Sequence, residues 1–251
     1  MSPTLAACEL THLERRPIDV ARAAAEHAAY EDALRALGAS VVRAAPAPEL
    51  PDAVFVEDAA VVLDEVAMIA RPGAPVRRAE TASVAEALRR YRTLAAVAAP
   101  ATLDGGDVLH IGRTLYVGIS SRTTREAVEQ LGRLLRPWDY RIVGVAITGC
   151  LHLKSAVTEV GEGLLLANPR WVNAAGFAPL EVLPVCEEEP GAANALRLGG
   201  AVIFPDHYPL TARRLADAGV AVLPVPCREI AKAEGGVTCC SLIVAVREAA
   251  P

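Results

Sequence analysis

Apolar positions along the chain follow either the spacing of a β-strand or the spacing of an α-helix. The two patterns alternate in an order that recurs along the chain. Short apolar runs joined by a turn predict a strand hairpin, which is followed by a helix-spaced segment and another short strand. Residues 108–117 predict such a hairpin, turning at Gly112-Arg113, and residues 124–135 and 141–145 predict its helix and strand. The same order predicts hairpins at 54–70, 152–167 and 194–204, helices at 81–91 and 210–218, and strands at 94–97, 181–184 and 220–225.

These units repeat with a nearly constant period. Five first strands open at positions spaced by 42 to 49 residues, namely Glu57-Asp58, Gly106-Asp107, His152, Asn194 and Cys239. A period of this length indicates equivalent units that bury their apolar faces only by packing against their neighbours. The chain is therefore expected to form a ring or an array of units rather than a doubly wound sheet.

The two ends of the chain supply the parts of one further unit. Asp19 can cap a helix over residues 19–37, and residues 40–43 follow as a short strand. The last hairpin begins at Cys239 and is incomplete. Because a unit divided between both ends closes a ring, we predict an α/β fold, a five-bladed α/β propeller with pseudo-fivefold symmetry, formed by a single domain over residues 1–251.

A closed ring also predicts where the polar residues meet. The starts of all five inner strands should converge at one end of the central axis. We therefore expect one mouth, lined by the polar residues at or next to these starts: Glu57, Asp58, Asp104, Asp107, His152, Asn194 and Cys239.

Composition and charge argue against several partners. With 53% hydrophobic residues the chain can fill a core, and with a net charge of -5 and no basic run it is not expected to bind nucleic acid or an anionic membrane. No apolar run approaches the roughly 18 residues that span a bilayer, and the N-terminus lacks the pattern of a signal peptide. Six cysteines without paired spacing suggest reduced thiols in the cytoplasm. The sequence does not distinguish a monomer from a homodimer.

Two adjacent cysteines near the C-terminus are the first candidates for chemistry. Cys239 and Cys240 follow a flexible Gly235-Gly236 and open the apolar run 242–246. On a strand their side chains point in opposite directions, so one thiol can be reactive while the other joins the core. Two small buried residues without reactivity are the alternative.

His152 is the only histidine at the start of a unit, and the repeat places it at a position equivalent to that of Cys239. With Asp104 to orient the imidazole, these residues match the arrangement of nucleophile, base and orienting carboxylate. A structural histidine is the alternative for His152 considered alone. The sequence contains no Cys-x-x-Cys or His-Glu-x-x-His spacing, so we expect no metal ion.

The acidic residues of the expected mouth indicate the substrate. Glu57-Asp58 lies between the apolar segments 54–56 and 59–62, which is not the pattern of a solvated charge run. Partly buried carboxylates require a cation, and a planar guanidinium offers several donors to them. Arg77 and Arg122 follow turns near the same end and can hold a substrate carboxylate, unless they are ordinary surface arginines.

Five segments, in order along nearly the whole chain, resemble the dimethylarginine dimethylaminohydrolases of the guanidine-modifying superfamily. The segments are Phe55-Val56-Glu57-Asp58, Arg71-Pro72-Gly73-Ala74-Pro75-Val76-Arg77-Arg78, Leu103-Asp104-Gly105-Gly106-Asp107-Val108-Leu109, Leu151-His152-Leu153-Lys154-Ser155 and Thr238-Cys239-Cys240-Ser241. The resemblance implies a five-bladed α/β propeller that hydrolyses methylated arginine to citrulline and a methylamine through a covalent thiouronium intermediate. It implies no cofactor, and zinc at the nucleophile would inhibit.

The resemblance also implies a role for individual residues. Cys239 corresponds to the nucleophile, His152 to the general acid and base, and Asp104 to the carboxylate that supports the histidine. Asp58 and Asp104 correspond to carboxylates that bind the guanidinium, with Glu57 and Asp52 as neighbouring substrate contacts. Arg77 and Arg122 correspond to the arginines that hold the amino-acid end, and the further implied contacts are Leu10, Ala233 and Glu234. Residues 1–17 correspond to a mobile loop that covers bound substrate. Relatives usually carry a β-strand ahead of this loop, so we expect the divided unit to be one strand short.

Two other functions fit the same residues. The first keeps the fold and changes the reaction, to an arginine deiminase, an amidinotransferase or a hydrolase of another guanidine. The second is a binding relative without catalysis, which the intact set of Cys239, His152 and Asp104 disfavours. A metal-dependent hydrolase is a more distant third.

Overall fold

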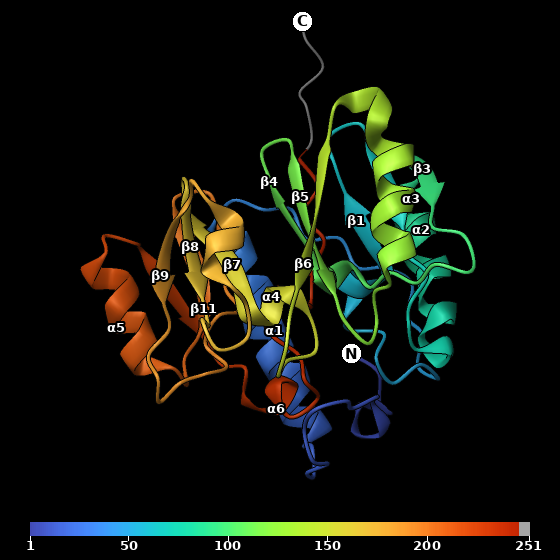
Figure 1. Cartoon of the computed structure of the whole chain (residues 1–251). Coiled ribbons are helices and arrows are strands. Elements are labelled where there is room, and N and C mark those ends of the chain that lie inside the picture. Colours follow the sequence, from blue (N-terminus) through green and yellow to red (C-terminus); the bar gives the residue numbers. More distant parts are fainter. Residues whose placement is uncertain (246–251) are drawn as a thin grey trace, which may run out of the picture.

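The computed structural model describes residues 1–245, whose strands form four three-stranded sheets. In each sheet the first two strands form an antiparallel hairpin and the third pairs in parallel with the second. The strands are β1 (Ala60–Val62), β2 (Val66–Ile69), β3 (Thr93–Ala96), β4 (Val108–Ile111), β5 (Thr114–Ile119), β6 (Arg141–Ala146), β7 (Val157–Gly161), β8 (Leu164–Ala167), β9 (Glu181–Pro184), β10 (Leu196–Leu198), β11 (Ala201–Pro205) and β12 (Val222–Val225). Figure 1 shows the sheets of β1–β3 and β4–β6 on one side of the short helix α4 (Leu153–Ala156) and the other two sheets on its opposite side.

A helical segment joins the second and third strands of each unit, as the repeat predicted. These segments are α2 (Thr81–Leu88), α3 (Arg125–Leu135), a 3₁₀ helix (Ala174–Phe177) and α5 (Pro209–Asp217). Each packs its apolar face on its sheet. In the second unit, for example, Leu131 and Leu135 of α3 join a buried cluster with Leu115 and Val117 of β5. Burial of such side chains stabilises each by about 1.5–3 kcal/mol.

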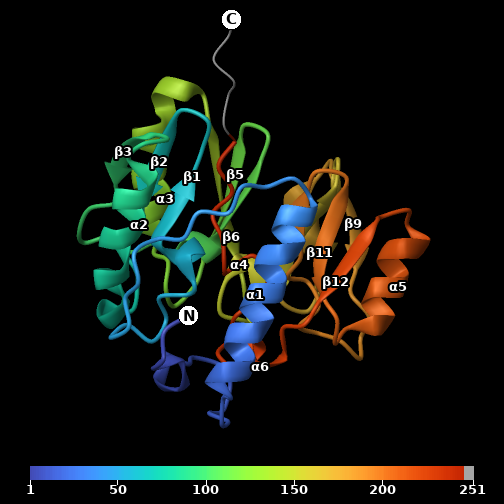
Figure 2. The same ribbon diagram turned by 180° about the vertical axis from the view of Figure 1, so that it is seen from behind.

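The helix α1 (Val20–Ala36) occupies the fifth position of the ring. Asp19 caps it by accepting a hydrogen bond from the backbone N–H of Arg22, and Gly38 follows its end at a φ of 89°. Figure 2, which views the molecule from behind, shows α1 in front, between the sheet that contains β12 and the sheet that contains β1. Although α1 is the longest helix, no helix within residues 1–245 is long and apolar enough to cross a membrane.

The two strands expected in the divided unit are absent from the described residues, and this is the main difference from the predicted fold. Residues 40–43 and the described residues from Cys239 to 245 contain no strand, and Val246 of the expected hairpin lies outside the described residues. A strand requires a neighbour that accepts and donates its backbone hydrogen bonds. Within residues 1–245 neither segment forms a backbone hydrogen-bond ladder with a strand, so the apolar pattern alone does not make them strands.

A single helical turn precedes the first strand in three of the units. These turns are Val56–Ala59, Gly105–Asp107 and α4, so the hairpins expected from residues 54 and 152 begin only at Ala60 and Val157. The backbone N–H of Glu57 donates to the carbonyl of Cys239 (3.1 Å), in another unit, instead of joining its own sheet. The turns therefore connect neighbouring units and carry polar side chains to the centre of the ring.

Candidate active site

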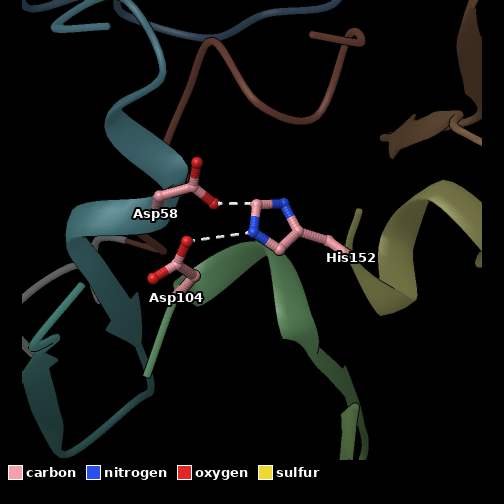
Figure 3. Close-up of side chains that lie close together, drawn as sticks. All are labelled: Asp58, Asp104 and His152. Atoms are coloured by element: carbon pink, nitrogen blue, oxygen red, sulfur yellow. Dashed lines mark hydrogen bonds and ion pairs between the residues drawn. The ribbon is translucent and has the colours of Figure 1, made fainter. Parts of the chain in front are cut away.

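Two carboxylates enclose the imidazole of His152. Its Nε2 lies 3.0 Å from Oδ2 of Asp104, and its Nδ1 lies 3.6 Å from Oδ1 of Asp58. Figure 3 shows the two carboxylates, which come from the first and second units, pointing toward the ring of His152 from the third. All three side chains are buried. The predicted contact between base and orienting carboxylate is therefore present.

The charge of this group follows from its partners. Burial alone would lower the pKa of His152, but the charge of Asp58, the hydrogen bond to Asp104 and the charge of Asp107 raise that pKa to about 9. Burial alone would raise the pKa of Asp58, but the charges of His152 and Arg77 lower it to about 2. The imidazole is therefore a cation at neutral pH and can donate a proton to a leaving group.

Two glycines of the Leu103–Leu109 segment permit this close packing. A Cβ at Gly106 would lie 2.6 Å from Nδ1 of His152 and 2.7 Å from Oδ1 of Asp58, and a Cβ at Gly105 would lie 2.0 Å from the carbonyl oxygen of Glu57. The backbone N–H of Gly106 donates to Oδ1 of Asp58 (3.1 Å). The Gly-Gly pair thus lets the second unit pass against the first without a side chain between them.

Asp104 and Asp107 of the same segment have different surroundings. Besides contacting His152, Asp104 accepts a hydrogen bond from the backbone N–H of Gly73 (2.8 Å). Asp107 accepts from the backbone N–H of Leu153 (2.9 Å) and the hydroxyl of Ser120 (2.7 Å). Burial raises the pKa of Asp107 to about 6 although His152, Ser120 and Leu153 oppose this rise. Asp107 therefore connects the second and third units.

The thiol of Cys239 is buried near the carboxylates of Glu57 and Asp58. Its Sγ accepts a hydrogen bond from the backbone N–H of Gly236 (3.3 Å). Burial, together with the charges of Glu57 and Asp58, raises the pKa of the Cys239 thiol far above its usual value. In the described chain no hydrogen bond joins this thiol to His152, so only one of the two contacts expected for a nucleophile, base and orienting carboxylate is formed.

Glu57 is buried, and both of its carboxylate oxygens have protein partners. Oε1 accepts from Nζ of Lys154, and Oε2 accepts from the hydroxyl of Thr238 at 2.7 Å. Sequence reasoning assigned no function to Lys154 or Thr238. Lys154 is a cation two positions after His152, and Thr238 directly precedes Cys239, so both positions offered a signal.

The two candidate arginines differ sharply. Arg77 is buried, and its guanidinium donates to Oδ2 of Asp58 (2.6 Å) and to Oε2 of Glu80 (2.8 Å). Arg122 is also buried, but its Nη1 has no hydrogen-bond partner within the described residues and lies 3.7 Å from Oδ2 of Asp104. Arg122 therefore retains a free donor in the mouth, whereas the guanidinium of Arg77 is committed to protein carboxylates.

The N-terminal loop closes over this region from the side of Glu234. The Glu234 carboxylate accepts hydrogen bonds from the backbone N–H groups of Thr11, His12 and Leu13. Glu234 has a φ of 57°, which is rare for a residue other than glycine. Of the other residues predicted here, Leu10 is half-buried, Ala233 is buried, and Oδ2 of Asp52 accepts from the backbone N–H of Glu9 at 3.1 Å. Glu234 thus holds the loop through three donors.

The cluster of Asp58, Asp104 and His152 offers three ligand atoms within 4.8 Å of one another. Such a set can coordinate a metal ion in principle. However, both oxygens of Asp58 already accept hydrogen bonds, from Arg77 and Gly106, and the raised pKa of His152 favours its cationic form, which has no lone pair for a metal. An ion would have to displace a proton and a guanidinium.

Comparisons with known proteins agree with this fold. The sequence model of the family described as "N,N dimethylarginine dimethylhydrolase, eukaryotic" matches residues 11–174. The N(G),N(G)-dimethylarginine dimethylaminohydrolase of Streptomyces coelicolor is 43% identical over 96% of this chain and 93% of its own length, and that of Pseudomonas aeruginosa is 34% identical over 89% of each. A structure of the Pseudomonas aeruginosa enzyme, as a Cys-to-Ser variant with citrulline, has a TM-score of 0.92 at 32% identity and covers 96% of this chain and 95% of its own.

A more distantly related structure shares the fold with this chain. The N-terminal domain of a cyanobacterial arginine dihydrolase has a TM-score of 0.83 at 23% identity, covering 91% of this chain and 88% of that domain. The structure has four sheets and one helical unit around a polar centre. This architecture and the two similar structures define the five-bladed α/β propeller of the guanidine-modifying enzymes. Within that class, the chain belongs to the dimethylarginine dimethylaminohydrolase family.

Proposed function

We propose that this protein hydrolyses Nω-methylated L-arginine to L-citrulline and dimethylamine or methylamine, with Cys239 as the nucleophile. The observation that carries the proposal is the pairing of a buried cationic imidazole, His152, with the buried carboxylates Asp58 and Asp104 in a chain that is 43% identical to a dimethylarginine dimethylaminohydrolase. The family relationship supports the reaction, and the charge pattern supports the roles of the residues.

A substrate guanidinium would change the charge balance around Cys239. Burial and the charges of Glu57 and Asp58 raise the pKa of the Cys239 thiol, so in the protein alone the thiol is protonated at neutral pH. A bound guanidinium cation would offset this negative charge and favour the thiolate. The thiol proton then leaves to solvent, and the substrate helps to generate its own nucleophile.

The reaction then proceeds in two halves. The Cys239 sulfur forms a bond to the guanidinium carbon, and the protonated His152 gives its proton to the departing methylamine nitrogen as the carbon–nitrogen bond breaks. The neutral His152 next removes a proton from water. The resulting hydroxide attacks the thiouronium carbon. As the carbon–sulfur bond breaks, the new hydroxyl group loses its proton to the departing sulfur, which gives citrulline and the Cys239 thiol and leaves His152 protonated. Asp104 orients the imidazole throughout.

The free donor of Arg122 is suited to the amino-acid end of the substrate. Its Nη1 is buried without a hydrogen-bond partner in residues 1–245, and a buried unpaired donor of this kind gains most from a carboxylate. Arg77 contributes indirectly, because it holds Asp58 ionised. The loop that contains Leu10 would cover the bound substrate, with Asp52, Ala233 and Glu234 at its edge.

A substrate panel tests the proposal. Asymmetric dimethylarginine, monomethylarginine, arginine and agmatine are each incubated with the enzyme, and citrulline and amine release are measured, with Cys239→Ser as the inactive control. We expect kcat/KM for the methylated arginines to exceed that for arginine by about tenfold or more, since recognition of a methyl group contributes about 1–3 kcal/mol. Faster release from arginine would contradict the proposal and favour an arginine-specific hydrolase.

A further inference from the structure

A closed ring of hydrogen bonds surrounds the residue that precedes Cys239. The hydroxyl of Thr238 donates to Oε2 of Glu57 (2.7 Å) and accepts from Nδ2 of Asn194 (2.9 Å). The backbone N–H of Thr238 donates to Oδ1 of the same asparagine (3.1 Å). Nδ2 of Asn194 also donates to the carbonyl of Lys154 (3.0 Å), and Nζ of Lys154 donates to Oε1 of Glu57. Four units of the propeller therefore meet at Thr238.

This ring also reaches the nucleophilic residue itself. The backbone N–H of Glu57 donates to the carbonyl of Cys239, and the backbone N–H of Gly236 donates to its sulfur. A Cβ at Gly236 would lie only 2.2 Å from Oδ1 of Asn194, so the backbone there passes directly against the asparagine. The segment before the thiol is thus held on both sides by polar groups that are buried and satisfied.

Charge within the ring is balanced by a single cation. Glu57 is buried beside Cys239, and its negative charge opposes ionisation of the thiol, whereas the positive charge of Lys154 favours it. Lys154 lies two positions after His152, so the segment that carries the acid and base also supplies the compensating cation. A fully satisfied buried network of this kind is rigid.

We propose that Lys154, Asn194 and Thr238 are positioning residues that fix the thiol of Cys239 in the mouth. This inference rests on the proposed function only in taking Cys239 as the nucleophile. It assigns Glu57 chiefly to the ring, because both of its oxygens have partners there. Loss of a ring member should therefore lower kcat while leaving KM for substrate nearly unchanged.

The first test compares two substitutions of Thr238. Thr238→Val removes both hydrogen bonds of the hydroxyl at constant shape, and Thr238→Ser retains them. Since a misplacement of about 1 Å can cost about a hundredfold in rate, we expect Thr238→Val to lower kcat by about tenfold to a hundredfold, with KM within about threefold. Thr238→Ser should restore most of the rate.

The matched control is Thr158→Val. Thr158 is equally buried, and its hydroxyl also bridges two units, donating to the carbonyl of Ala193 and accepting from the backbone N–H of Ala195. This substitution should lower the melting temperature without lowering kcat. Equal losses of kcat in Thr158→Val and Thr238→Val, or a normal kcat in Thr238→Val, would overturn the inference.

The second test does not depend on the identity of the substrate. The rate of Cys239 alkylation by iodoacetamide is followed from pH 6 to pH 11 by mass spectrometry of the peptide, with the modified cysteine localised by fragmentation. In Lys154→Met the alkylation rate at a given pH should fall by about tenfold, because loss of the compensating cation raises the pKa of the thiol and lowers the fraction of thiolate. Lys154→Arg should stay close to the unsubstituted protein.

The two outcomes separate the inference from the proposed function. An unchanged alkylation rate in Lys154→Met would overturn the inference even if methylarginine is turned over. A lowered alkylation rate in Lys154→Met, in a protein that fails on every member of the substrate panel, would uphold the inference and reject the substrate. Should Thr238→Val fail to fold, the alkylation profiles of the two Lys154 variants decide alone.

Discussion

Nε2 of His152 lies 3.0 Å from Oδ2 of Asp104, and neither side chain is exposed to solvent by more than a few per cent. This contact contributes to both stability and chemistry, because it favours the protonated imidazole that the proposed mechanism requires as an acid. It also makes the stability of the fold depend on pH in a direction that can be measured.

The pH dependence follows from the raised pKa of His152. Its pKa is about 9 in the folded protein and about 6.5 when unfolded, so its stabilising contribution is fully present below about pH 6.5 and is lost as the pH rises through 9. The contribution is about 3 kcal/mol. Denaturant unfolding between pH 6 and pH 10 should therefore show a decline in the free energy of unfolding that is smaller in His152→Gln. Parallel profiles for the two proteins would contradict this prediction.

The adjacent residues Cys239 and Cys240 allow a direct test of which thiol is the nucleophile. We expect Cys239→Ser to reduce turnover by at least about a thousandfold, because a serine hydroxyl is not ionised by these surroundings. The thiol of Cys240 donates to the carbonyl of Gly236 (3.7 Å), a contact that a serine hydroxyl can also make, so Cys240→Ser should retain most of the activity. Steady-state citrulline release measures both. Equal losses would remove the assignment of Cys239.

Much of the fold could be predicted because its signals are local. The hairpin of β4 and β5 turns at Gly112-Arg113 as expected, since alternating apolar residues and a turn glycine specify it without help from the rest of the chain. Residues 56–59 were misread as strand because they continue an apolar run. Their backbone instead bonds to Cys239, which lies far away in the sequence, and no local pattern encodes that partner.

The site likewise has features that the sequence predicts and features that depend on partners far away in the chain. The period of the repeat placed His152, Asp58 and Asp104 at one mouth, and the structure brings them together. Sequence reasoning could not say which polar groups remain free for a ligand, because that depends on side-chain partners in other units. Glu57, for example, is occupied by Lys154 and Thr238. Only Glu80, three residues after Arg77 on one helical turn, was close enough in sequence to be anticipated.

Arg77→Met should mainly affect stability. It would leave the buried carboxylates of Asp58 and Glu80 without their shared cation, and removal of one partner from a buried ion pair costs about 3–5 kcal/mol. Burial already raises the pKa of Glu80 to about 7 although Arg77 opposes this rise. Thermal unfolding measures the effect, with Arg78→Met as the control, because the Arg78 guanidinium donates to the carbonyl of Pro72 outside this cluster. A melting temperature equal to that of the control would refute this role.

Arg122→Met should instead affect substrate binding. The Nη1 atom of Arg122 lacks a hydrogen-bond partner within residues 1–245, whereas Nη2 donates to the hydroxyl of Thr11 (2.9 Å), so the substitution removes a donor that is free for substrate together with one contact to the N-terminal loop. Loss of a charged hydrogen bond to a substrate carboxylate corresponds to about 1.5–3 kcal/mol, or about tenfold to a hundredfold in KM. Agmatine lacks that carboxylate, so any slow turnover of it should be insensitive to the substitution. A large fall in stability with an unchanged KM would contradict this prediction.

Glu234 should control the N-terminal loop. Its carboxylate accepts three backbone hydrogen bonds from residues 11–13, and a hydrogen bond to a charged group contributes about 1.5–3 kcal/mol. In Glu234→Ala the loop should open more often, and the exposed Arg15-Arg16 should be cleaved by trypsin about tenfold faster or more. Glu14→Ala removes a charge from the same loop without touching these donors and serves as the control. Because an open loop covers substrate less, KM should rise in Glu234→Ala alone, and equal cleavage of the two variants would show that Glu234 does not hold the loop.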